Sequence, residues 1–299
     1  MVELVECVPN VSEGRRTDVV EAIARAAGSV EGVRVLDVES DASHNRSVIT
    51  FLGDREAVAE AAFRCAREAV ARIDMNVHRG EHPRVGALDV LPFVPIAGVT
   101  MDDCVALARS VGRRIAEELG VPVYLYEAAA TRPDRRALPD VRRGEYEGLR
   151  AAIETDPDRA PDFGPRRLHP TAGATIVGAR PVLIAWNVNL RTRDVGLAKR
   201  IAKEIRESDG GLPAVRAKGF DLADRGLVQV SMNMTDYRRT SLLQAFDAIR
   251  ARAEAAGVEI AESEIVGLVP LDALAEAARD RLRLAGLTRE QILEARVWE

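Results

Sequence analysis

The sequence predicts an α+β fold of two tandem ferredoxin-like (split βαβ) subdomains, each with an antiparallel or mixed sheet and helices on one sheet face. The order strand–helix–strand–strand–helix–strand occurs twice, with matching elements roughly 180 positions apart. Strand segments alternate between apolar and polar residues, whereas helix segments carry apolar stripes. The predicted domains are residues 1–180, which include a linker at 128–180, and residues 181–299.

The first half of the chain supplies three predicted helices, each begun by a capping residue. Thr17, Asp54 and Thr100 precede apolar stripes, and Thr100 opens a Thr-x-x-Asp capping box. The strand LDVLPFVPI carries two prolines, which predicts a place near a sheet edge because proline cannot donate to the ladder. In order, the elements are a strand at 3–9, a helix at 17–28, a hairpin at 33–53, a helix at 54–73, the strand at 88–96, a helix at 100–119 and a strand at 121–127.

The second half repeats this order of elements. Its hairpin turns about Ala-Asp-Arg-Gly, and Asp236 is predicted to lead into the second helix. In order, the elements are a strand at 182–190, a helix at 193–208, a hairpin at 215–234, a helix at 236–256, one or more strands in 258–270 and a helix at 272–284.

A split βαβ unit leaves one sheet face uncovered, and strand alternation predicts which side chains this face carries. Short amides, rather than long charged side chains, favour a wet groove that binds a ligand. The alternative is a partly exposed sheet face without a ligand. The polar side chains predicted to share the open faces are Asn187, Asn189, Gln229, Ser231 and Asn233 in the second half and Asp37 and Glu39 in the first.

The linker at 128–180 is rich in arginine, proline and glycine and shows no apolar period. Loops longer than about 12–15 residues without secondary structure are usually functional or disordered. A linker that crosses the mouth of a cleft would be a natural ligand contact.

Composition excludes several classes of function. The 299 residues carry a net charge of −5 with no basic run, which disfavours nucleic acid as a partner. The three cysteines, Cys7, Cys65 and Cys104, are far apart, so neither a disulfide framework nor a zinc site is expected. The N-terminal segment does not resemble a secretory signal, and no apolar stretch reaches about 18 residues, so we expect a cytoplasmic protein without a membrane span.

The loop His-Arg-Gly-Glu-His-Pro-Arg at 78–84 holds two of the four histidines. Histidine can both give and take protons near neutral pH. Pro83 forces His82 toward an extended backbone, and the glycines on either side, Gly80 and Gly86, let the chain turn. The loop is therefore predicted to aim the His82 side chain, with Glu81 orienting the ring.

Other interpretations of this loop stay open on the residues alone. It can be an ordinary surface loop rich in histidine and arginine, and spacing does not choose between His78 and His82. Arg79 or Arg84 could hold an anion. His44, in a hairpin turn, and His169, in the linker, are expected to be ordinary polar loop residues. No hydrolase elbow, phosphate loop or activated cysteine is found, which leaves acid–base chemistry without a covalent step or a metal.

Long segments of the chain resemble glutamate formimidoyltransferase, the formiminotransferase part of formiminotransferase-cyclodeaminase. The resemblance runs over nearly the whole chain, in order and with few gaps. The segments that carry it are LVECVPNVSEGRR at 4–16, IDMNVHRGEHPRVGALDVLPFVPI at 73–96, PVYLYE at 122–127, RRGEYEGL at 142–149, APDFGP at 160–165, GATIVGARPVLIAWNVNL at 173–190, LVQVSMNMTDY at 227–237 and IVGLVPLDAL at 265–274.

The resemblance implies N- and C-terminal formiminotransferase subdomains, a homodimer, and formimidoyl transfer between N-formimidoyl-L-glutamate and tetrahydrofolate in histidine degradation and one-carbon metabolism. It implies that His82, in the GEHPR motif, is the catalytic acid–base and that no metal is needed. Because the sequence has no room for a cyclodeaminase domain, we expect the product to pass to a separate enzyme. The folate-contacting segment implied by the resemblance comprises Phe163, Gly164, Pro165, Arg166, Arg167, Leu168, His169, Pro170, Thr171 and Ala172.

Both implied substrates carry carboxylates, so arginines are expected beside them, and Arg84, Arg166 and Arg167 are the predicted partners. The nearest alternative is glutamate formyltransferase on the same fold. A carboxylate in the groove, Asp37 or Glu39, would favour a cationic amidine over a neutral formyl group. A folate-binding protein without catalysis is a second alternative, and a ferredoxin-like RNA-binding module is disfavoured by the 4% aromatic content.

Overall fold

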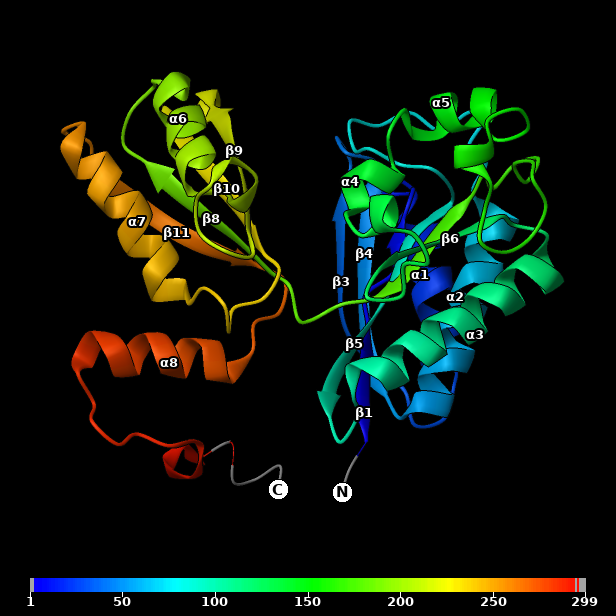
Figure 1. The fold of residues 1–299 in the computed structure, drawn as a ribbon, viewed down its shortest axis with the longest axis horizontal. Coiled ribbons are helices and arrows are strands. Elements are labelled where there is room, and N and C mark those ends of the chain that lie inside the picture. The colour runs from blue at the N-terminus through cyan, green and yellow to red at the C-terminus, as the bar shows by residue number, and fades with distance from the viewer. Residues whose placement is uncertain (1–2, 294, 296–299) are drawn as a thin grey trace. The chain divides into compact units, whose positions relative to one another are not determined.

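The structure, a computed structural model, describes residues 3–293 and residue 295. The chain divides into two compact units, residues 1–181 (unit 1) and 182–299 (unit 2). Each unit contains a β-sheet and several helices, so the predicted α+β class with two tandem units is confirmed. The two units are described separately below (Figure 1).

Unit 1 is built on a seven-stranded mixed sheet. Along the sheet the order is β3, β4, β1 together with β2, β5, β7 and β6. Pairs on the β3 side are antiparallel, whereas β7 runs parallel to both β5 and β6. The strands are β1 (Leu4–Cys7), β2 (Asn10–Val11), β3 (Arg34–Asp41), β4 (Arg46–Gly53), β5 (Leu88–Ala97), β6 (Val123–Glu127) and β7 (Thr175–Ala179).

Strand β5 lies inside the sheet, so the predicted place near an edge is wrong. It pairs with β1 and β2 on one side and with β7 on the other. Pro92 lies where β1 gives way to β2, and its carbonyl accepts the N–H of Val8. Pro95 faces Val5, beside a shift in the β1–β5 register. Each proline thus coincides with an interruption of the ladder, where its missing N–H is not needed.

Three helices pack together on one face of this sheet, namely α1 (Thr17–Gly28), α2 (Arg55–Arg72) and α3 (Met101–Leu119) (Figure 1). Asp54 caps α2 by accepting from the N–H of Ala57, and Thr100 forms the predicted capping box of α3. The first helix begins at Thr17 itself, since Arg16 holds the N-cap position without a side-chain bond. Their apolar stripes bury against Phe51 and Phe93 of the sheet.

The segment at 128–180 is folded into unit 1, contrary to the expectation of a long irregular linker. It contains α4 (Leu138–Val141), α5 (Glu145–Ala152) and β7, together with short 3₁₀ turns. A second core lies on the other sheet face, formed by α4 and α5 against Tyr124 and Tyr126 of β6 and Ile176 of β7. Helices therefore cover both faces of this sheet, with the predicted helices on one face and the short helices α4 and α5 on the other.

Unit 2 carries a four-stranded antiparallel sheet in the order β11, β8, β10, β9. Along β10 the predicted alternation is confirmed, with Val228, Val230, Met232 and Met234 buried. The second helix starts later than predicted, at Leu242, where Ser241 forms a capping box with Gln244. The elements are β8 (Ile184–Leu190), α6 (Val195–Ile205), β9 (Val215–Leu222), β10 (Leu227–Met234), α7 (Leu242–Ala255), β11 (Ile260–Val266) and α8 (Leu271–Leu282).

The three cysteines are free and buried in the core of unit 1. Burial raises the pKa of Cys65 to about 12 and that of Cys104 to about 11, and it also raises the pKa of Cys7. Because the thiolate is the reactive form, we expect the native protein not to react with a disulfide reagent such as DTNB at about pH 8. The unfolded protein should titrate all three thiols. Rapid labelling of the native protein would contradict the buried placement.

Candidate functional site

His82 lies in the loop between α2 and β5, half-buried beside β4. Its Nε2 is 3.3 Å from a terminal guanidinium nitrogen of Arg46, the first residue of β4. The His44 ring, from the β3–β4 turn, stands edge-on with its centroid 6.3 Å away. Burial, followed by the charges of Arg46 and Arg142, lowers the pKa of His82 to about 2. His82 is therefore a neutral imidazole at neutral pH.

The His82 loop is held by close backbone approach. A Cβ on Gly80 would lie 2.2 Å from the carbonyl oxygen of His44, and one on Gly86 would lie 1.9 Å from that of Ala174. Neither glycine has a positive φ, so the loop needs them for their small size and not for a left-handed backbone. The Asn45 side chain adds a bond to the carbonyl of Arg79 at 2.9 Å.

His78 is buried, and both of its ring nitrogens are occupied. Nε2 lies 2.9 Å from the carbonyl oxygen of Asn45, and Nδ1 accepts from Nε of Arg84 at 3.4 Å. Burial lowers the pKa of His78. These contacts fit a histidine that holds the loop in place. His82, by contrast, has the contact with Arg46 at Nε2, so fewer of its ring atoms are engaged.

The guanidinium N–H groups of Arg84 are already paired and are not available to a substrate carboxylate. Its guanidinium is buried and forms ion pairs with Glu145 at 3.0 Å and Glu147 at 2.7 Å, both on α5. The contacts therefore support a role in fastening the His82 loop to α5. Glu81 is exposed and, among the described residues, forms no hydrogen bond with His82. The structure therefore gives no support to the prediction that Glu81 orients the ring.

Arg46 and Arg142 are site residues that sequence reasoning missed. Arg46 donates to Oδ1 of Asn10 at 3.0 Å, while Arg142, the residue after α4, forms an ion pair with the buried Asp89 of β5. The Nε atoms of both arginines are buried and have no hydrogen-bond partner within the described part of the chain. The signal in the sequence is Asp89, a lone carboxylate in an otherwise apolar strand, because a buried charge requires a partner.

The C-terminal end of the segment at 163–172 bonds to the backbone of the His82 loop. The carbonyls of Thr171 and Ala172 accept from the N–H groups of Met75 at 2.7 Å and Ala87 at 2.8 Å, one on each side of the loop. His169 Nδ1 caps this end by accepting from the N–H of Ala172 at 3.0 Å. The segment therefore brackets the loop that carries His82.

The N-terminal end of the same segment packs elsewhere in unit 1. Phe163 bonds to the backbone of Val123 and contacts Arg113, while Gly164 adopts a φ of +87°. Arg166 and Arg167 are exposed, and Arg166 donates to the carbonyl of Ile153 at 3.0 Å. Gly164 and Pro170 are exposed, whereas Pro165 and Leu168 are half-buried.

Carboxylates of β3 also act on this site. Glu39 and Asp41 are close enough to raise the pKa of Arg46, although burial and Arg142 lower it overall. Of the two carboxylates predicted for the groove, Glu39 is thus the one near enough to act on Arg46, where it contributes less than Asp89 and Asp41.

The open face of the unit 2 sheet carries a network of amides and carboxylates. Asn187 donates to Glu264 at 3.1 Å, and Asn189 donates to Glu262 at 3.0 Å. Gln229 donates to Asn189 at 3.1 Å. Asn189 is fully buried within this network even though its strand side faces away from the apolar core. The predicted polar face is present, and β11 supplies its carboxylates.

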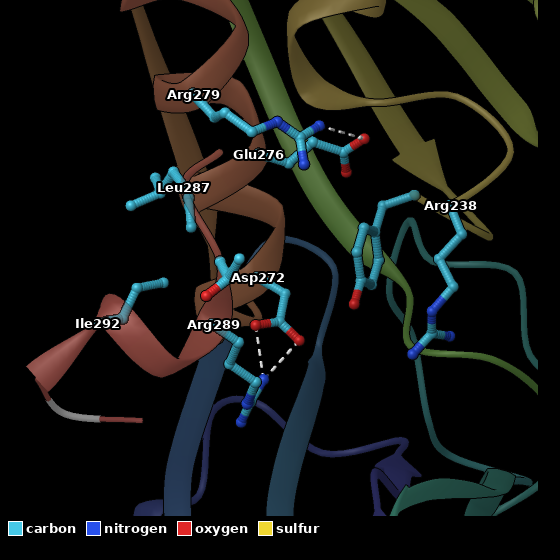
Figure 2. A pocket seen from close by; sticks show the side chains of 10 residues that line it. Arg238, Asp272, Glu276, Arg279, Leu287, Arg289 and Ile292 are labelled. Carbon is cyan, nitrogen blue, oxygen red and sulfur yellow. Dashed lines mark hydrogen bonds and ion pairs between the residues drawn. The ribbon is translucent and has the colours of Figure 1, made fainter. Parts of the chain in front are cut away.

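A hollow of about 360 Å³ lies in unit 2, against α8 (Figure 2). Figure 2 shows Arg289 paired with Asp272 and Arg279 paired with Glu276 along its wall. It contains none of the predicted site residues. Within the described ranges, no cluster of histidine, cysteine and carboxylates suited to a metal is found, and no helix there is both long and apolar enough to cross a membrane.

The pH dependence of stability should report the burial of His82. Because its pKa falls from 6.5 to about 2 on folding, the unfolded chain binds a proton in this range that the folded chain does not. Stability should therefore fall as the pH decreases below 6.5, by up to about 1.4 kcal/mol per pH unit from this group. Urea denaturation between pH 6.5 and about pH 5 should show a shallower loss for His82→Ala than for the wild type. Equal losses would contradict this.

Two family models match the chain. Residues 4–180 match the model described as "Formiminotransferase domain, N-terminal subdomain". Residues 185–290 match the model described as "Formiminotransferase domain".

Curated relatives match over almost the entire chain. A glutamate formimidoyltransferase of Thermoplasma acidophilum is 50% identical over 99% of this chain and 98% of its own length. One of Streptococcus pyogenes serotype M1 is 47% identical over 98% of each chain. A formimidoyltransferase-cyclodeaminase of Sus scrofa is 48% identical over 93% of this chain, which corresponds to 52% of the relative.

Proposed function

Because this chain belongs to the formiminotransferase family, we propose that it is an enzyme that transfers a formimidoyl group between N-formimidoyl-L-glutamate and tetrahydrofolate. The products are 5-formimidoyltetrahydrofolate and L-glutamate. The observation that carries the proposal is 50% identity to a glutamate formimidoyltransferase over 99% of the chain. Tetrahydrofolate is a co-substrate, and no metal takes part.

His82 is the proposed acid–base of the reaction. N5 of tetrahydrofolate attacks the amidine carbon, the N5–carbon bond forms, and His82 accepts the N5 proton. His82 then gives this proton to the glutamate nitrogen as the carbon–nitrogen bond breaks. At neutral pH the ring is neutral and has a nitrogen that can accept a proton, but a pKa of about 2 makes it a weak base until the arginine charges are offset. Such catalysis contributes about 10²–10⁴ in rate, and holding both substrates together can supply about 7–11 kcal/mol of the barrier.

The segment from Phe163 to Ala172 is proposed to contact tetrahydrofolate. The bonds from Thr171 and Ala172 to the two sides of the His82 loop support this, because a folate on the segment would lie close to the reacting group. Exposed Arg166 and Arg167 are available for the glutamyl carboxylates of the folate.

Further features are proposed from the strand order and from the family. Both units are inferred to be ferredoxin-like, which the orders β5-β1-β4-β3 and β11-β8-β10-β9 support. A homodimer, a cytoplasmic location and a place in histidine degradation are inferred from the family resemblance alone.

Transfer of a formyl group is the second candidate function. The positive charges of Arg46 and Arg142 at His82 oppose a cationic amidine, whereas Asp41 and Glu39 partly offset them, so experiment separates the two donors. The test is to incubate the protein with tetrahydrofolate and either N-formimidoyl- or N-formyl-glutamate. Substituted folate from the first donor alone supports the proposal, and from the second alone overturns it. Folate binding without reaction of either donor would identify a binding protein.

A further inference from the structure

Two arginines that act on His82 carry N–H groups without an acceptor among the described residues. One guanidinium nitrogen of Arg46 lies 3.3 Å from His82 Nε2, and the charges of Arg46 and Arg142 both act on that ring. The Nε of each arginine is shielded from solvent and bonds to nothing among the described residues. A buried N–H without an acceptor is costly, so an anion that reached these groups would be stabilised.

The charge at this point is only partly balanced. Asp89 is fully buried and pairs with Arg142, and its other oxygen accepts from the N–H of Val85 at 2.7 Å. Among the described residues, Arg46 forms no ion pair. Its hydrogen bonds are to the side-chain oxygen of Asn10 and to the His82 ring. The remaining titratable groups that act on the cluster are His44, Asp41 and Glu39. One arginine charge therefore lacks a bonded carboxylate.

We propose that Arg46 and Arg142 form a binding site for the α-carboxylate of the group donor, directly beside the acid–base His82. This inference rests on the proposed function. Arginine presents planar N–H groups that suit a carboxylate, and Asp89 acts as the positioning residue that fixes Arg142.

The chemistry of the donor selects this carboxylate. In N-formimidoyl-L-glutamate the nitrogen that leaves and the α-carboxylate are attached to the same carbon atom. A donor whose nitrogen faces His82 therefore brings its α-carboxylate to the arginines. The glutamyl carboxylates of tetrahydrofolate lie across a benzoyl ring and an amide from N5, so they fall farther from His82.

Binding of the carboxylate would also change the proton affinity of His82. The two arginine charges disfavour protonation of the ring, and an anion between them offsets this effect. His82 would then become a stronger base only when the donor is bound. The arginines thus link occupancy of the site to the step in which His82 accepts the N5 proton.

The test compares donors on the wild-type enzyme. The donor amidated at its α-carboxylate should lose about 10- to 100-fold in kcat/KM, whereas the donor amidated at its γ-carboxylate should lose less. Equal losses for the two amides would overturn the assignment. If N-formimidoyl-L-glutamate itself does not react, the proposed function fails instead, so the two failures are distinguishable.

A variant then locates the site. Arg46→Gln should remove most of the discrimination between N-formimidoyl-L-glutamate and its α-amide, and Arg46→Lys should restore part of it. Full discrimination in Arg46→Gln would overturn the proposal. Tetrahydropteroate lacks the glutamyl tail of tetrahydrofolate. If Arg46→Gln instead lost the preference for tetrahydrofolate over tetrahydropteroate, the arginine would bind a folate carboxylate and the proposal would be overturned. Should Arg46→Gln fail to fold, Arg142→Gln is measured in the same way, and full discrimination between the two amides in that variant would overturn the proposal.

Discussion

Replacement of His82 by alanine is expected to lower kcat for formimidoyl transfer at least about 10²-fold. The reason is that, in the proposed mechanism, the neutral imidazole accepts the N5 proton and returns it to the departing nitrogen. His78 is buried with both ring nitrogens occupied. The affinity for tetrahydrofolate should remain near that of the wild type. Single-turnover kinetics and equilibrium folate binding would measure the two quantities separately.

His44→Ala is the matched comparison for that variant. It removes a second imidazole from the same cluster, but one that is exposed and lies 3.0 Å from Asp41. We expect a much smaller loss of kcat than in His82→Ala. Comparable losses in the two variants, or unchanged turnover in His82→Ala, would remove His82 from the mechanism.

Gly86→Ala is expected to destabilise the protein by about 2–3 kcal/mol and to reduce activity with it. The added Cβ would lie 1.9 Å from the carbonyl oxygen of Ala174 and 2.6 Å from that of Ala172, and both obstacles are backbone atoms. The chain can relieve this overlap only by moving the His82 loop away from the segment at 172–174. Chemical denaturation would measure the loss of stability.

Gly148→Ala is the control for this variant. Gly148 lies in α5, and a Cβ at this position would meet no atom within 4 Å. Alanine is favoured over glycine in a helix by about 0.5–1 kcal/mol, so the variant should be as stable as the wild type or slightly more stable. A similar loss in both variants would show that close approach at Gly86 is not the cause.

The sequence predicted the regular elements well because their signals are local. Asp54 and Thr100 cap their helices as expected, and strand alternation identified the buried side of β10. β7 was missed because a parallel strand buried on both faces shows a continuous apolar run and not an alternation. The edge position predicted for β5 was wrong because the interruptions that accommodate its prolines lie in β1 and β2, far along the sequence.

For the site, the sequence could propose residues but not their partners. The His82 loop is contiguous, so its histidines, glycines and proline are visible together. Arg46 and Arg142 come from a strand and from the end of a short helix, and only folding brings them to His82. Arg84 resembled a substrate ligand because its partners, Glu145 and Glu147, lie more than sixty positions away. The catalytic role of His82 remains a prediction.

The place of β7 has a consequence for the order in which unit 1 forms during synthesis. Among the strands that the structure describes, β6 pairs only with β7, apart from a single bridge between Val123 and Phe163, and β7 joins it to β5. A nascent chain that has released β6 therefore has no strand with which to pair it until residues 175–179 emerge. Until then Tyr124 and Tyr126 have only part of their packing. The ribosome must thus add about fifty residues after β6 before the sheet can close, an interval in which an unpaired strand is open to association with other chains.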